Sequence, residues 1–436
     1  MDLDGREVIR GLWDEHVHVV QAALAAVRVP LGGTESAAET LARMAPALAG
    51  ATDDEPVVGL GFQDGLWPDA PTLAAIDAVA GERTVVLISH DVHAVWLSSA
   101  AARRFGAEPG EDGLLREGPA FAVSRETSVL EQRRVGPAVA ALLAAASARG
   151  VTGIVDFEMA WSRDAWRERM SGEWAGPRIE AAVYPPDLAR AEASGLATGD
   201  DVEGTGGLLR VGPLKTLIDG ALNTRTAYCV DPYPDGSHGL LTVPRDELGA
   251  LLARARAARL VPAVHAIGDA AVTAALDGFE AAGIGGRMEH AQLVADGDLP
   301  RFAALGVTAS VQPAHLLDDR EVAAEHWAGR TARAYPLRSL LDAGATLAFG
   351  SDAPVAPLDP LLAMRAAVDR AQPGEDPWHP EQRIGLDEAL RAATRGRAEP
   401  RAGDPADLVV LDAPVDRLEE GSVAMTLVAG RFTHRR

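Results

Sequence analysis

The 436-residue sequence is poor in cysteine and in positive charge. Its single cysteine, Cys229, excludes an internal disulfide and agrees with a reducing compartment. Asp and Glu (63 residues) outnumber Lys and Arg (41 residues), which gives a formal net charge of −22. Because so acidic a chain repels phosphate and has no basic stripe, we expect no nucleic-acid partner.

The sequence also lacks long apolar runs. No apolar stretch approaches the roughly 20 residues that a helix needs to cross a bilayer. The opening residues, MDLDGREVIRG, carry acids where a secretory signal has basic residues. We therefore expect a soluble, cytoplasmic protein with no membrane partner.

Lysine is the scarcest of the charged residues. Among the 41 Lys and Arg residues, only Lys215 is a lysine. A general bias toward arginine explains the others, but it does not explain why one lysine persists. An ammonium group can lose its proton when it is desolvated, whereas a guanidinium effectively cannot. Since a neutral amine is a nucleophile, Lys215 is a candidate functional residue.

Apolar runs that end in polar residues alternate with Ala/Leu/Arg-rich helical stretches along most of the chain. The runs span residues 8–19, 150–157, 178–186, 208–220, 261–269, 286–293, 306–313 and 345–352. Eight buried strands that alternate with helices predict an α/β fold with a closed (β/α)8 TIM-type barrel. An open, doubly wound sheet is the alternative.

Two regions lie outside this pattern. Residues 31–140 are too long for one crossover and contain strand candidates at 56–62 and 84–89. We predict an inserted subdomain there, which could cover the barrel mouth. Residues 1–30 would then start the barrel, residues 141–400 would supply its strands two to eight, and residues 401–436 would form C-terminal strands.

Histidine, lysine and aspartate side chains end several of the predicted strands. His16 and His18 are two residues apart and so share one face of the first strand. The later strands contribute Lys215, His265, His290 and Asp352. The carboxyl ends of barrel strands meet at one mouth, and imidazole and carboxylate groups suit Zn²⁺ and similar ions.

This donor set predicts two metal ions, because four histidines and one aspartate exceed the needs of one tetrahedral ion. Two ions need a bridge, and a carbamate formed from neutral Lys215 and CO2 would supply one. Arginine cannot form a carbamate. The pKa of Lys215 must therefore be lowered by burial or by the neighbouring cations.

These motifs identify a resemblance to the amidohydrolase superfamily, and within it to amidohydrolase family 3, which includes N-substituted formamide deformylases. The matching segments, in order, are GLWDEHVHV, SHDVHAVWLSSAA, VGPLKTLIDGALNTRTA, HAIGDAAVTAALDGFE, RMEHAQL, SVQPAHLLDD, AFGSDAPVAPLDPL and GDPADLVVLD. The resemblance implies that His16 and His18 bind one ion, that His265 and His290 bind the other, and that Lys215 is the carbamylated bridge. It implies that Asp352 is the remaining ligand and the proton carrier.

The resemblance also implies a small β-sandwich built by strands before the barrel together with the C-terminal strands, 406–412 and 422–432. Here the chain starts almost at the first barrel strand. Either the start codon has been assigned too late, or half of the sandwich has been lost. In the second case the C-terminal strands would have unpaired edges that favour association, and a homodimer is the expected assembly.

The expected reaction is hydrolysis of a non-peptide, amide-like C–N bond in a small molecule. A metal-bound hydroxide would attack the carbonyl, and Asp352 would pass a proton to the departing amine. One alternative is a mononuclear, deaminase-like site in which Lys215 stays unmodified. Another is a barrel that binds a small molecule without catalysis.

Several residues are candidates for substrate contact. A second donor to the carbonyl oxygen could be His93 or His315. Trp96 lies next to His93 in the sequence, and Trp67 belongs to the same predicted subdomain; these residues either bind substrate or form a half-buried aromatic cluster. Arg225 either holds a substrate carboxylate or pairs with an acidic side chain.

Residues around the ligands are expected to support them. Asp14 and Asp269 would orient ligand imidazoles or loops. Glu289 should point away from the mouth by strand alternation. The histidines away from strand ends are expected to be surface or loop residues: His90, His238, His326, His379 and His434.

Overall fold

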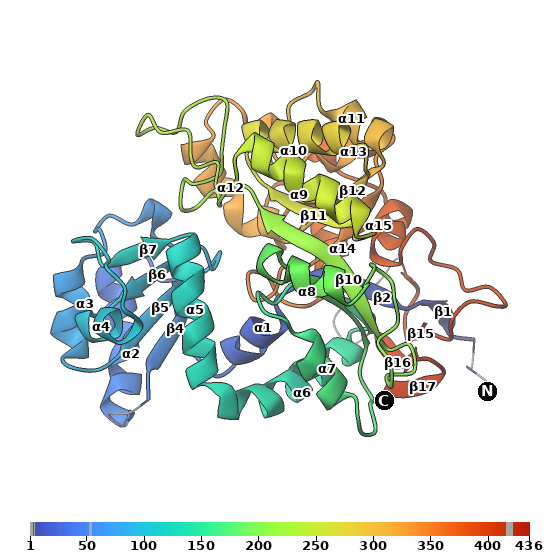
Figure 1. The fold of residues 1–436 in the computed structure, drawn as a ribbon, viewed down its shortest axis with the longest axis horizontal. Helices are drawn as coiled ribbons and strands as arrows, with labels where there is room; N and C mark the ends of the chain where they lie inside the picture. The colour runs from blue at the N-terminus through green and yellow to red at the C-terminus, as the bar shows by residue number, and fades with distance from the viewer. Residues whose placement is uncertain (1–2, 4, 52–54, 416–421) are drawn as a thin grey trace.

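The computed structural model describes the chain except for residues 1–2, 4, 52–54 and 416–421. At its centre is a parallel sheet in which consecutive strands of the barrel pair with one another (Figure 1). A parallel bridge between Val17 and Ala353 joins the chain after the last strand to the first strand. The strands are β2 (Leu12–Val17), β8 (Val151–Asp156), β9 (Arg178–Val183), β10 (Leu209–Leu217), β11 (Pro262–Ala266), β12 (Gly286–His290), β13 (Val307–Val311) and β14 (Leu347–Phe349).

This order confirms the predicted (β/α)8 barrel. A doubly wound sheet reverses its strand order at a switch point, and no such reversal occurs among these eight strands. The apolar side chains on the outer face of the sheet pack against the surrounding helices; Met288 of β12, for example, lies in one buried cluster with Leu276 and Phe279. The helices of the barrel are α1 (Val19–Ala25), α6 (Gln132–Ala148), α7 (Arg163–Arg169), α8 (Leu188–Ala193), α9 (Arg245–Ala257), α10 (Asp269–Ala282), α11 (Leu299–Leu305), α12 (His315–His326), α13 (Leu337–Asp342), α14 (Pro360–Asp369) and α15 (Leu386–Ala393).

The first predicted strand is in fact two strands in two different sheets. β1 (Glu7–Arg10) ends before Gly11, and β2 begins after it. The N–H of Gly11 donates to the Asp407 carbonyl, next to the small antiparallel sheet that contains β1. A Cβ on Gly11 would lie 1.9 Å from Oγ1 of Thr152 in β8. The chain can therefore pass from one sheet to the other at this point only because residue 11 has no side chain.

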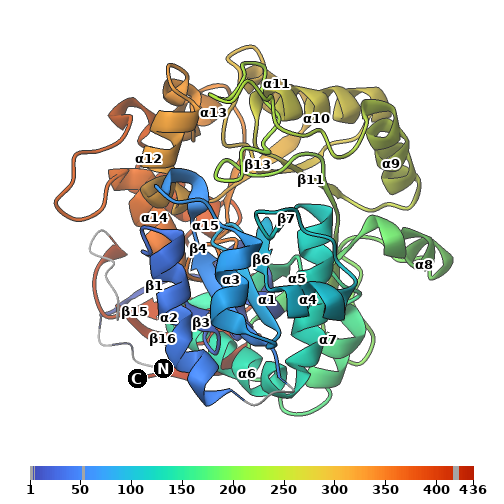
Figure 2. The same ribbon diagram turned by 90° about the vertical axis from the view of Figure 1, so that its left-hand side faces the viewer.

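The segment between β2 and β8 contains a second sheet, which forms a separate lobe beside the barrel (Figures 1 and 2). Its first three strands are parallel and its last two are antiparallel to their neighbours. The strands predicted at 56–62 and 84–89 are present as β4 (Val57–Phe62) and β5 (Val85–Ser89). The lobe, called the insertion below, contains β3 (Val29–Pro30), α2 (Ala37–Gly50), β4 (Val57–Phe62), α3 (Leu73–Ala80), β5 (Val85–Ser89), β6 (Ala94–Leu97), α4 (Ser99–Phe105), β7 (Leu114–Arg116) and α5 (Gly118–Leu130).

The C-terminal strands belong to a four-stranded antiparallel sheet with the order β1, β15 (Leu408–Leu411), β16 (Val423–Val428) and β17 (Arg431–Arg435). β15 is paired on both edges, by β1 and β16, so the expectation of an unpaired edge is wrong for the first predicted strand. The second predicted strand, 422–432, is in fact two strands. β16 is paired by β15 and β17, whereas β17 is an edge strand that pairs with β16 within the described residues. Most of the acidic link between β15 and β16 is outside the described residues.

None of the described helices is both long enough and apolar enough to cross a bilayer.

Candidate metal centre

The barrel brings together the six side chains that were predicted as metal ligands. β2 carries His16 and leads directly into His18, and the other four lie on or just after β10, β11, β12 and β14. None of the six is more than 8% exposed. The six residues are His16, His18, Lys215, His265, His290 and Asp352.

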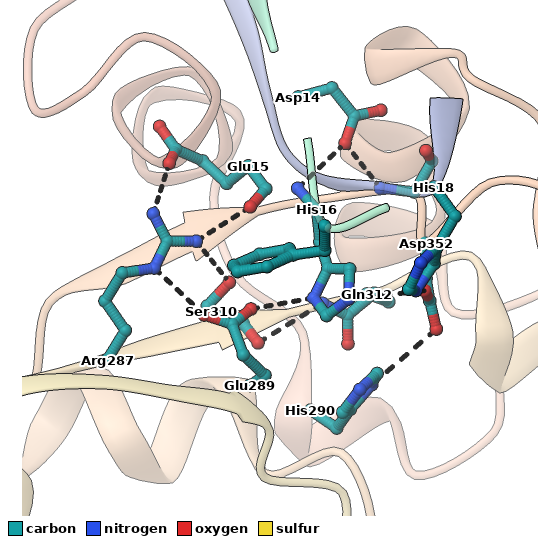
Figure 3. Close-up of polar contacts among 12 residues, drawn as sticks. Asp14, Glu15, His16, His18, Arg287, Glu289, His290, Ser310, Gln312 and Asp352 are labelled. Carbon is teal, nitrogen blue, oxygen red and sulfur yellow. Dashed lines mark hydrogen bonds and ion pairs between the residues drawn. The ribbon is translucent and has the colours of Figure 1, made fainter. Parts of the chain in front are cut away.

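Asp352 lies beside the imidazole rings of His16, His18 and His290 (Figure 3). Its Oδ1 atom is 3.4 Å from Nε2 of His16 and 3.3 Å from Nε2 of His18. Its Oδ2 atom is 4.0 Å from Nδ1 of His290, whose ring centroid is 4.4 Å from that of His265. Side chains carried by β2, by β12 and by the loop after β14 therefore lie close together, while Nε2 of His265 is 3.2 Å from the Gly220 carbonyl oxygen.

The same atoms suit a divalent cation. His16, His290 and Asp352 each offer a ligand atom, and these atoms lie within 4.8 Å of one another. Nδ1 of His290 and Oδ1 of Asp352 are buried and have no hydrogen-bond partner. Buried polar atoms without a partner are costly, so these atoms fit a site that could hold a divalent cation.

The ionisation states also suit metal binding. Burial lowers the pKa of His16, with a further contribution from Lys215, and burial likewise lowers the pKa of His290. Both rings are therefore neutral at neutral pH, the form that binds metals. Burial alone would raise the pKa of Asp352, but the adjacent His16 and His18 hold it below its ordinary value, so the carboxyl is ionised.

Lys215 is 1% exposed, and its Nζ atom lies 4.7 Å from the centre of the Phe157 ring. Burial lowers the pKa of Lys215 to about 8, although the negative charges of Glu289 and Asp352 partly oppose this. With that pKa, roughly a tenth of the amine is neutral at pH 7. Part of Lys215 is therefore present as the neutral amine at neutral pH.

Glu289 lies inside the barrel and contacts His16, one of the predicted metal ligands (Figure 3). Its Oε2 atom accepts a hydrogen bond from Nδ1 of His16 at 2.8 Å, and its Oε1 atom accepts one from Nε of Arg287 at 2.9 Å. Because Nδ1 of His16 is held in this way, Nε2 faces Asp352. A carboxylate behind a ligand histidine is a common arrangement in metal sites.

The expectation that Glu289 points away from the mouth is therefore wrong. It assumed that His290 continues the alternation of β12, but His290 has a φ of 75° and leaves the extended backbone. Glu289 and Arg287 are consequently the inward-facing residues. Arg287 and Glu289 are two residues apart in a buried strand, and this spacing was the sequence signal that both side chains share one face.

Of the two predicted supporting aspartates, Asp14 lies at the site. It accepts hydrogen bonds from the backbone N–H groups of His16 (3.2 Å) and Ser351 (2.9 Å), which ties the first strand to the loop that carries Asp352. Asp269 instead holds a loop, because it accepts from the N–H of Val230 at 2.8 Å.

Asp219, which the sequence reasoning missed, lies closer to a ligand than Asp269 does. Its Oδ1 atom is 3.4 Å from Nε2 of His265. It also accepts hydrogen bonds from the backbone N–H groups of Ile267 and Gly268, which follow β11. Asp219 follows β10 in the segment TLIDG, and this strand-end position was the sequence signal that could have identified it as a site residue.

A cavity above the ligands lies between the barrel and the insertion. His93 and Gln63 line it from the insertion, and Asn223, His315 and Asp352 line it from the barrel. The insertion therefore covers the mouth of the barrel, and both predicted donor histidines reach the cavity.

His93 and His315 differ in their environments. Nδ1 of His93 is 2.9 Å from Oε2 of Glu117. Burial alone would lower the pKa of His93, but Glu117 outweighs it and raises the pKa to about 9. Nε2 of His315 is 3.2 Å from the Ser351 carbonyl, and burial lowers its pKa. His93 is therefore the cationic histidine of the two at neutral pH.

Three other candidates do not reach the cavity. Trp96 is fully buried in the core of the insertion, and its Nε1 donates to the Thr72 carbonyl. Trp67 packs against the same core, with its ring 5.7 Å from that of Phe62. Arg225 is exposed and lies 3.7 Å from the carboxylate of Asp235, so it pairs with an acid.

One of the histidines that were expected on the surface or in loops needs correction. His326 is the last residue of α12 and is buried, with its ring against that of Tyr233. His90 lies in the turn after β5, as expected, and also lines the cavity.

Known proteins resemble the chain along its whole length. A profile of the amidohydrolase family matches residues 1–434. Protein LONG AFTER FAR-RED 3 of Arabidopsis thaliana is 31% identical, over 90% of this chain and 74% of the relative. N-substituted formamide deformylase of Arthrobacter pascens is 32% identical, over 52% of this chain and 46% of the relative. The crystal structure of an uncharacterized metal-dependent hydrolase from Pyrococcus horikoshii has a TM-score of 0.75 at 25% identity, covering 97% of this chain and 89% of that one.

Proposed function

The chain belongs to the amidohydrolase family, and we propose that it hydrolyses a non-peptide C–N bond in an amide or formamide. The family and the Pyrococcus relative support a metal-dependent hydrolase. The observation that carries the proposal is the meeting of His16, His290 and Asp352 donor atoms in a buried cluster. The partial match to N-substituted formamide deformylase supports the choice of bond.

Two divalent ions would be held by His16, His18, His265, His290 and Asp352. Zn²⁺ is the expected metal, since imidazole ligands dominate the set. A divalent ion supplies Lewis acidity toward a carbonyl and acidifies water. Lys215 could supply a carbamate to these ions: its neutral nitrogen would bond to the carbon of CO2 and release one proton, which leaves one negative charge shared by two oxygens.

Asp352 would carry the proton. Its carboxyl is ionised because its pKa is lowered by His16 and His18, so it can accept a proton from the attacking water. It would then donate that proton to the nitrogen of the leaving amine, which cannot depart as an anion. Its backbone N–H donates to the His16 carbonyl at 2.7 Å, which fixes the loop and hence the position of the carboxylate.

His93 would donate a hydrogen bond to the substrate carbonyl oxygen. Glu117 occupies Nδ1, which leaves Nε2 as the free nitrogen on the cavity side. Its charged state at neutral pH makes Nε2 a donor. His315 contributes less as a donor because its ring is neutral.

The cavity favours a neutral or cationic substrate. Its lining contains no Arg or Lys side chain, and its acidic residues Asp91 and Asp318 stand against one cationic side chain, His93, which already pairs with Glu117. A substrate carboxylate would therefore lack the guanidinium partner that usually recognises it. We expect N-acyl or N-formyl amines to be preferred over N-acyl amino acids.

The mononuclear, deaminase-like site is a second candidate. Three ligand residues gather in one cluster, which could satisfy a single ion. Metal stoichiometry and the mass of the chain distinguish the two. Two ions per chain, with an acid-labile gain of one CO2 at Lys215, support the dinuclear site. One ion and an unmodified lysine support the alternative.

The test of the function is amine release from a panel of N-formyl and N-acetyl amines. We expect activity in the Zn²⁺-loaded enzyme, loss after chelation and recovery after Zn²⁺ is restored. Asp352→Asn should be inactive. Asp201→Asn, which alters an exposed partner of Arg210, should be as active as the wild type. A metal-loaded enzyme that releases no amine from any member of the panel would refute the proposal.

A further inference from the structure

A chain of hydrogen bonds runs from the cavity across the junction of the insertion and the barrel. Nδ1 of His93 is 2.9 Å from Oε2 of Glu117. The hydroxyl of Thr226 donates to the other carboxylate oxygen, Oε1, at 2.6 Å. His93 and Glu117 belong to the insertion, whereas Thr226 lies in the loop after β10 of the barrel. Glu117 therefore joins the two units through its two oxygens.

The backbone of Glu117 is held in an unusual conformation that serves this contact. Its φ is 56°, a region that residues with a side chain rarely adopt. Its N–H donates to the His93 carbonyl at 2.9 Å. Although Glu117 immediately precedes α5, its side chain makes no capping hydrogen bond to that helix. The carboxylate is therefore directed to His93 and Thr226 instead of its own helix.

The barrel provides space for this contact at Gly220. A Cβ at that position would lie 2.2 Å from Oε1 of Glu117 and 2.1 Å from Oγ1 of Thr226. The Thr226 hydroxyl is further fixed because it accepts the N–H of Ala221 at 3.0 Å. The close approach of the two units thus depends on a glycine in the barrel loop.

The three polar side chains are shielded from water. His93 is 8% exposed, and Glu117 and Thr226 are each 6% exposed. A buried carboxylate that loses one of its partners is destabilised, because its remaining oxygen is left poorly satisfied. The His93–Glu117 pair is therefore fully satisfied only while the insertion lies against the barrel.

We propose that Glu117 and Thr226 are positioning residues that aim Nε2 of His93 into the cavity while the insertion lies against the barrel. The claim that His93 contacts a substrate carbonyl there rests on the proposed function. The orientation of the His93 ring does not depend on it. Neither Glu117 nor Thr226 lines the cavity above the ligands, so each acts through His93.

A double-mutant cycle tests this link in the Zn²⁺-loaded enzyme with an N-formyl amine. His93→Gln and Thr226→Val should each lower kcat by roughly 10- to 100-fold, the usual cost of a misplaced catalytic group, with a small change in KM. The double variant should be nearly as active as the slower single variant, because both changes remove one function. Losses that multiply would overturn the proposal.

Two further variants separate positioning from general stability. Thr226→Ser keeps the hydroxyl and should recover most of the lost kcat. Thr127→Val removes an equally buried hydroxyl, which donates to the Val123 carbonyl within α5, and should leave kcat unchanged. A loss in Thr127→Val as large as that in Thr226→Val would contradict the specific role of Thr226.

The ring orientation can be measured without a substrate. In enzyme labelled with ¹⁵N-histidine and loaded with Zn²⁺, the Nδ1 proton of His93 should give a protected signal that His93→Gln removes. We expect Glu117→Ala to abolish this signal and Thr127→Val to leave it unchanged. A signal that survives Glu117→Ala would overturn the proposal. If this pattern is found but no amide is hydrolysed, the proposed function fails and the positioning role stands.

Discussion

Glu289→Gln is expected to weaken metal binding although Glu289 is not itself a ligand. The carboxylate accepts from two different donors, Nδ1 of His16 through Oε2 and Nε of Arg287 through Oε1. A glutamine has one acceptor oxygen and turns an N–H2 group toward the other donor. It cannot satisfy both donors, so either the ligand imidazole or the guanidinium loses its partner.

The magnitude follows from the type of contact that is lost. A buried hydrogen bond to a charged group contributes about 1.5–3 kcal/mol. If that loss falls on His16, it corresponds to a decrease in metal affinity of roughly 10- to 100-fold. Glu289 is fully buried, so water cannot take the place of the missing partner.

Competition with a zinc-chelating dye measures this effect directly. Glu180→Gln is the matched control, since Glu180 also pairs with an arginine, Arg395 at 2.7 Å, but does not contact a ligand histidine. We expect a lower zinc affinity for Glu289→Gln and an unchanged affinity for the control. Equal zinc affinities for Glu289→Gln and the wild type would refute the role of Glu289 in orienting His16.

Three other predictions concern the lysine, the substrate and the fold. Lys215→Arg retains a positive charge but cannot form a carbamate, so bound metal and amine release should both fall sharply; wild-type activity in this variant would exclude the carbamate. Among formamides of similar size, those that carry a carboxylate should have the lowest kcat/KM, because no lining Arg or Lys binds it; a preference for the carboxylate would show that the cavity has been misinterpreted. Gly11→Ala should lower the unfolding free energy by about 1–3 kcal/mol, since its Cβ would collide with Thr152, whereas Gly249→Ala, with open space around it, should not; equal melting temperatures would argue against the close approach at Gly11.

The barrel could be predicted from the sequence because each of its strands is a compact apolar run followed by a helical stretch. The ligands could be located because barrel topology places strand ends together, whatever their separation in the chain. His16 and Asp352 are far apart in the sequence, yet Nε2 of His16 lies 3.4 Å from Oδ1 of Asp352.

The missed features depend on local backbone geometry. The change of sheet at Gly11 is hidden within one continuous apolar run, because nothing in the pattern marks where β1 ends. Likewise, the positive φ of His290 breaks the alternation of β12 and turns Glu289 inward. Alternation predicts a residue's face only while the backbone remains extended.

Side chains of the insertion were harder to assign than those of the barrel. Trp96 and His93 are close in sequence, yet Trp96 packs in the core and His93 reaches the cavity. Without the topology of a new sheet, its inner and outer faces cannot be distinguished. The partnership of Glu117 with Thr226 depends on how two units dock, which no local sequence pattern encodes.

Anomalous diffraction at the zinc edge from crystals of the Zn²⁺-loaded enzyme tests the central claim most directly. We expect two peaks among His16, His18, His265, His290 and Asp352, with additional density on Nζ of Lys215 between them. An absence of peaks at this end of the barrel, or zinc bound only elsewhere, would contradict the account.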